Sequence, residues 1–133
     1  AFEPYGAGLA AIRAKDTDIT KLAAYANEMG NTAYSKEKRA LADMNFHVLI
    51  TEMSGNPFMR TVGSLIKAAL VGIFRMSNPD TDPNEISDVS ASHLRLVEAF
   101  RLRDEAAARR EMERLIENGR QQVLEFTARN TPR

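Results

Sequence analysis

The stretch ADMNFHVLITEMSGNPF, residues 42 to 58, contains the clearest signals for how this chain folds. In a helix over this stretch, apolar side chains fall on every face, which is typical of a helix with neighbours on most of its sides. Gly55 can end that helix in the left-handed conformation, and Asn56-Pro57 is an N-cap followed by proline at the first helical position. The stretch therefore predicts a central helix over 36–54, begun by Ser35, with a second helix directly after it.

Helical periodicity continues along the rest of the chain. Apolar residues recur three or four positions apart in the later segments, and no segment shows the sustained alternation of a strand. Asp82-Pro83 and Asp104 supply capping acids for two more helices. We predict helices over 4–14, 17–29, 36–54, 57–77, 83–102 and 104–128. The short connections favour antiparallel neighbours, so the predicted fold is all-α, an antiparallel helical bundle of about six helices.

The composition excludes several classes of protein. The chain has 133 residues, which fits one domain, and no cysteine, which excludes a disulfide framework and thiolate metal sites. The chain has 18 basic residues (lysine and arginine) and 18 acidic residues (aspartate and glutamate), so the net charge is zero. A domain that mainly holds nucleic acid usually carries an excess of basic residues. No stretch is long and apolar enough to span a membrane, and the N-terminus is not a signal peptide. We expect a soluble, cytoplasmic domain.

Two histidines and one aspartate occupy positions where apolar residues are expected. Asp43 and His47 lie one helical turn apart and share a face of the central helix, and His93 interrupts the apolar stripe of the helix over 83–102. Imidazole nitrogens and carboxylate oxygens suit zinc, nickel, iron or manganese, and bundles build metal sites from facing helices. The alternative is purely structural: Asp43 accepts a hydrogen bond in the core and His93 is a satisfied core histidine.

No nucleophile or phosphate-binding loop accompanies these residues. No serine lies in a G-x-S-x-G context, and the seven glycines are scattered along the chain. We therefore expect no enzyme activity. The arginines of the last helix alternate with glutamates and are interpreted as a solvated face.

The order and spacing of these motifs resemble a known family. The string D-x-x-F-H-x-x-I-x-x-x-S-G-N-P, here Asp43, Phe46, His47, Ile50, Ser54, Gly55, Asn56 and Pro57, is similar to the FCD ligand-binding domain. That domain is the C-terminal effector domain of FadR-type regulators in the GntR superfamily. His93-Leu94 and the segment from Arg103 to Met112 resemble the family's second half. The resemblance extends from about Glu3 to about Phe126 and implies an antiparallel helical bundle with a central ligand cavity.

The resemblance also implies a metal site. Many members of the family bind a divalent metal through one aspartate and three histidines, which places ligands at Asp43, His47 and His93. The position of the third histidine is Leu115 here. Three possibilities stay open: three protein ligands hold a metal such as zinc or nickel, the same groups bind the ligand directly, or, least favoured, they form the two-histidine, one-carboxylate triad of a metalloenzyme.

The expected function follows from this resemblance. We expect a metabolite-sensing domain of a transcription regulator that binds a small carboxylate or sugar acid, with Asn45 and Arg75 as additional ligand-binding residues. A homodimer is expected, with DNA bound only through a winged helix-turn-helix domain that this chain lacks, since Ala1 resembles a position inside the family's first effector-domain helix. The competing class is a helical protein-interaction module in which the aspartate and histidines are structural.

Overall fold

A computed structural model of the chain describes residues 2–59, 61, 63, 65, 68, 69 and 82–130. The regular elements of these residues are helices, namely α1 (Phe2–Arg13), α2 (Asp16–Met29), α3 (Lys36–Met53), α5 (Pro83–Arg101) and α6 (Glu105–Asn130). The all-α class is therefore confirmed. The helix predicted over 57–77 is confirmed at positions 57–59, 61, 63, 65, 68 and 69, and its other residues lie outside the described part.

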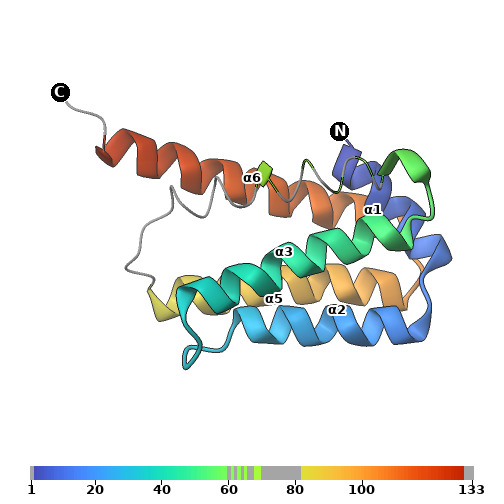
Figure 1. The fold of residues 1–133 in the computed structure, drawn as a ribbon, viewed down its shortest axis with the longest axis horizontal. Coiled ribbons are helices and arrows are strands. Elements are labelled where there is room, and N and C mark those ends of the chain that lie inside the picture. Colours follow the sequence, from blue (N-terminus) through green and yellow to red (C-terminus); the bar gives the residue numbers. More distant parts are fainter. Residues whose placement is uncertain are drawn as a thin grey trace.

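The five complete helices pack in a closed ring. The order around the ring is α3, α2, α5, α6, α1 and back to α3, and α1 also contacts α5. α2 runs antiparallel to both α3 and α5, and α6 runs antiparallel to α5 (Figure 1). α3 and α5 therefore run in the same direction on either side of α2, and none of their Cα atoms approach within 8 Å. Side chains, and not close backbone packing, must connect these two helices.

Most helix ends follow the predicted capping residues. The side chains of Ser35, Asp82 and Asp104 accept hydrogen bonds from backbone N–H groups in the first turns of α3, α5 and α6. Gly55 has φ of +68° just after α3, in the left-handed region that favours glycine. The start of α2 differs from the prediction: Lys15 is its N-cap and makes no side-chain cap bond. Asp16 is instead the first helical residue, where its charge stabilises the helix N-terminus.

The first helix begins two residues earlier than predicted. Pro4 lies in the first turn of α1, where a missing N–H costs no intrahelical hydrogen bond. Small residues then cover the inner face of α1, and a Cβ atom at Gly8 would lie only 2.9 Å from Cγ of Arg109 on α6. α1 therefore packs closely against α6.

The core explains which faces of α3 are buried. Phe46 and Ile50 are almost completely buried, together with Leu22, Leu96, Phe100 and Met112 from the neighbouring helices. Burying each such side chain contributes about 1.5–3 kcal/mol to folding. Leu41 belongs to the apolar residues that predict neighbours on most sides of α3, but it is 51% exposed, so its side of the helix is not covered. No helix within the described residues is long and apolar enough to cross a bilayer.

Candidate metal centre

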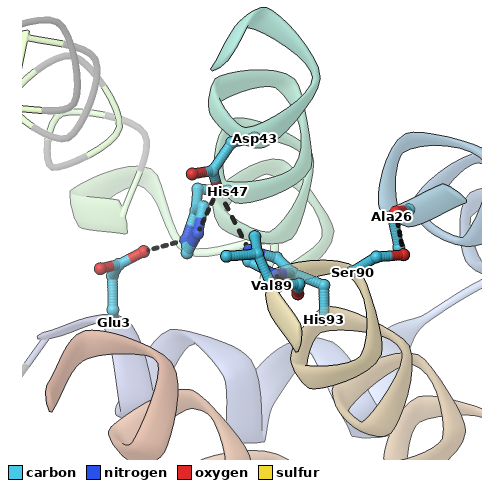
Figure 2. Close-up of polar contacts among 7 residues, drawn as sticks. All are labelled: Glu3, Ala26, Asp43, His47, Val89, Ser90 and His93. Carbon is cyan, nitrogen blue, oxygen red and sulfur yellow. Dashed lines mark hydrogen bonds and ion pairs between the residues drawn. The ribbon is translucent and has the colours of Figure 1, made fainter. Parts of the chain in front are cut away.

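Three side chains converge between α3 and α5, where the two backbones stay apart. Asp43 Oδ1 lies 3.1 Å from Nε2 of His47 and 3.1 Å from Nε2 of His93. Figure 2 shows both imidazole rings directed at the same carboxylate oxygen. The structure thus brings together the three residues that the sequence singled out, and the site bridges the α3–α5 gap.

The surroundings hold the two imidazole rings in place. His47 is 7% and His93 5% exposed, whereas 34% of the Asp43 side chain remains accessible to solvent. The ring of Phe46 packs edge-on against both imidazoles, with centroid distances of 5.7 Å to His47 and 4.8 Å to His93. The nitrogens are therefore held by buried surroundings, while the carboxylate between them is partly exposed to solvent.

Each histidine has its second ring nitrogen bonded to an acceptor. His47 Nδ1 lies 2.6 Å from Oε1 of Glu3, and His93 Nδ1 lies 2.7 Å from the carbonyl oxygen of Val89 (Figure 2). A carboxylate and a carbonyl can only accept, so Nδ1 donates in both rings. The Nε2 atoms are then the nitrogens available to a cation, which is the usual arrangement of metal-binding histidines.

This geometry requires positive charge between the three groups. A neutral imidazole with its proton on Nδ1 presents a lone pair at Nε2, and that lone pair would face another lone pair on Asp43 Oδ1. Only a proton or a metal ion between the two atoms makes the contact favourable. The same three groups can therefore hold protons when no ion is bound and a cation when one is.

The pKa values describe the metal-free form. Burial by itself would raise the pKa of Asp43, but hydrogen bonds from His47 and His93 outweigh it and hold that pKa well below its usual range. Burial likewise would lower the pKa of His47, but the charge of Glu3, together with Asp43, raises it to about 10. Without metal, Asp43 is therefore an anion paired with a protonated His47.

The donor set also fits a divalent transition metal. The three ligand atoms lie within 4.8 Å of one another. Two ligands bound at about 2.1 Å lie about 3.4 Å apart in tetrahedral geometry and about 3.0 Å apart at right angles, a range that includes the two 3.1 Å contacts. Leu115, where the resemblance predicts a fourth ligand, is a partly buried residue that packs against the core and has no donor atom.

The other predicted site residues do not join this cluster in the described part of the chain. Asn45 is half-buried, and because it follows Asp43 by two residues it lies about 200° around α3 from the carboxylate. Arg75 lies outside the described residues. Their roles in ligand binding stay predictions. So does the central cavity, since most of the segment from 60 to 81 also lies outside the described part.

Glu3 is the residue that sequence reasoning missed. Its carboxylate reaches His47 from α1, a helix separated from α3 in sequence by more than 20 residues. An acidic residue in a first helical turn is ordinary, because it stabilises the helix N-terminus. Nothing in the local pattern therefore distinguished Glu3 from the other first-turn acids.

Comparison with protein-family models identifies the family of this chain. The chain matches the FCD domain over residues 1–118 and belongs to that family. FCD domains are the regulatory, ligand-binding domains of GntR-type transcription regulators. A comparison with curated proteins gives no match for this chain.

Proposed function

We propose that this chain senses a small carboxylate metabolite through a divalent metal held by Asp43, His47 and His93. The observation that carries the proposal is the convergence of two Nε2 atoms on one carboxylate oxygen, each at 3.1 Å. The fixed Nδ1 partners support it, since a site that only filled core space would not need both rings oriented toward the same point. Zinc and nickel fit the nitrogen and oxygen donors.

The three ligands contribute different groups to binding. His47 and His93 supply buried, oriented nitrogens, and Asp43 supplies a charge that remains partly open to solvent. A bound ion supplies positive charge and open coordination positions for carboxylate oxygens. Because Leu115 offers no donor, the position of the family's fourth ligand is left to water or to the metabolite.

Ligand binding then controls DNA binding by the parent protein. A metabolite that binds one arrangement of the domain more tightly than another shifts the population toward it. We propose that the shift is passed to a winged helix-turn-helix domain of the same regulator, which acts as a homodimer in the cytoplasm. DNA contacts then belong to that second domain and not to the bundle.

Metal binding and thermal stability test the proposal. The purified chain should retain zinc or nickel, and its melting temperature should fall when a chelator removes the ion. Ligand at 100 times its Kd stabilises a protein by about 2.7 kcal/mol, so the shift is measurable. Asp43→Ala should abolish it, whereas Asp88→Asn, an exposed acid on α5, should leave it unchanged.

The outcomes separate the alternatives. A metal-independent shift with carboxylic acids that disappears in Asp43→Ala would mean that the three groups bind the metabolite directly. Absence of metal, of a chelator effect and of any shift with a panel of carboxylic acids would refute sensing at this site. Asp43, His47 and His93 would then be a structural cluster in a helical interaction module.

A further inference from the structure

The hydrogen bond between Glu3 and His47 has a different origin from its counterpart at His93. His93 donates from Nδ1 to the carbonyl of Val89, four residues earlier in its own helix. His47 contacts the residue four positions earlier, Asp43, through its Nε2 atom and the Asp43 side chain. The acceptor at Nδ1 is instead supplied by another helix, because Glu3 reaches the ring from the first turn of α1.

We infer that Glu3 is a positioning residue of the metal centre, which keeps the proton of His47 on Nδ1 and so presents Nε2 to the ion. This inference rests on the proposed function, because it concerns the same site. Glu3 Oε1 lies on the opposite side of the ring from Asp43, which excludes it as a ligand at the same ion in this ring orientation. Its effect must pass through His47.

The contact between Glu3 and His47 fixes the position of the ring proton for two reasons, its hydrogen-bond chemistry and its rigidity. A carboxylate cannot donate, so the 2.6 Å contact holds only with the proton on Nδ1. The negative charge of Glu3 also makes the ring a better donor of electrons to a metal. The Glu3 side chain is 20% exposed and is carried by a helix that packs closely on α6, so water does not readily replace it.

Zinc affinity of the full chain, measured by competition with a chromogenic chelator, tests the inference. Glu3→Ala removes the acceptor and should weaken zinc binding about 10- to 100-fold. Glu3→Gln keeps an acceptor oxygen but removes the negative charge, so zinc affinity should fall less than in Glu3→Ala. Glu37→Gln is the matched control, because Glu37 is an exposed first-turn glutamate of α3, and its affinity should equal that of the wild type.

Nitrogen-15 NMR of the imidazole rings distinguishes positioning from a general loss of stability. In the zinc-loaded wild type, His47 should show a protonated Nδ1 and a coordinating Nε2. In zinc-loaded Glu3→Ala, coordination at Nε2 still leaves the proton on Nδ1, but without the Glu3 acceptor that proton should exchange faster with water. The His93 signals serve as an internal control and should not change, because the acceptor of that ring is the Val89 carbonyl.

The possible results separate this inference from the proposed function. Equal zinc affinity and an unchanged exchange rate of the His47 Nδ1 proton in Glu3→Ala, with tight binding by the wild type, would overturn the role of Glu3 alone. Failure of the wild type itself to bind zinc would overturn the metal centre and the role of Glu3 with it. Weaker zinc binding, with faster Nδ1 proton exchange confined to His47, would establish the role of Glu3.

Discussion

Replacing Phe46 with alanine tests how the core and the candidate site depend on each other. Phe46 is completely buried on α3, and its edge contacts reach both His47 and His93. Burying a phenylalanine side chain completely contributes about 1.5–3 kcal/mol. Measured losses for such truncations are about 3–5 kcal/mol, which include the energy of the cavity left behind.

Urea denaturation and thermal melting of the metal-free chain measure this effect. For a chain of 133 residues, each kcal/mol corresponds to about 3–5 °C, so Phe46→Ala should lower the melting temperature by roughly 10–20 °C. Leu41→Ala is the matched control on the same helix. Leu41 is 51% exposed, so the loss should stay below about 1 kcal/mol.

Similar losses of stability for Phe46→Ala and Leu41→Ala would mean that α3 does not present Phe46 to the core. The zinc affinity of Phe46→Leu supplies a second measurement. A leucine fills much of the volume but lacks the ring edges against both imidazoles, so affinity should fall while most stability remains.

Three further predictions concern backbone conformation, capping and pH. Gly55→Ala should cost about 1–2 kcal/mol in urea denaturation, because φ is +68° and the new Cβ would lie 2.8 Å from the Arg13 guanidinium. Asp82→Ala should lower stability by about 1 kcal/mol and reduce helical circular dichroism through loss of the α5 cap. His47 has its pKa raised to about 10, so its contribution to metal-free stability is complete below pH 6.5 and is lost as pH rises through about 10. Denaturation between pH 6.5 and 10 should show that decline, and His47→Ala should flatten it; a flat wild-type profile would contradict the pairing with Glu3.

Local sequence patterns were sufficient for the helices and their ends. Serine and aspartate caps act within three residues, and apolar periodicity acts within one helix, so Ser35 and Asp82 could be identified without tertiary information. The start of α2 was less predictable, because Lys15 makes no side-chain cap bond and leaves only a weak signal.

Local sequence patterns also identified part of the candidate site. Asp43 and His47 could be paired from their spacing, and His93 could be suspected from its place in an apolar stripe. Asn45 was chosen for its proximity in sequence, yet helix geometry turns it away from Asp43.

The sequence by itself determined the all-α class, most helix boundaries and the identity of the three polar residues in the core stripes, because each depends on interactions within a few turns. Only the tertiary structure decided that His47 and His93 aim at one oxygen of Asp43, and that Glu3 fixes the His47 ring. The contacts of Glu3 with His47 and of Asp43 with His93 join residues 44 and 50 positions apart. Their geometry depends on how α1, α3 and α5 pack together with α2 and α6.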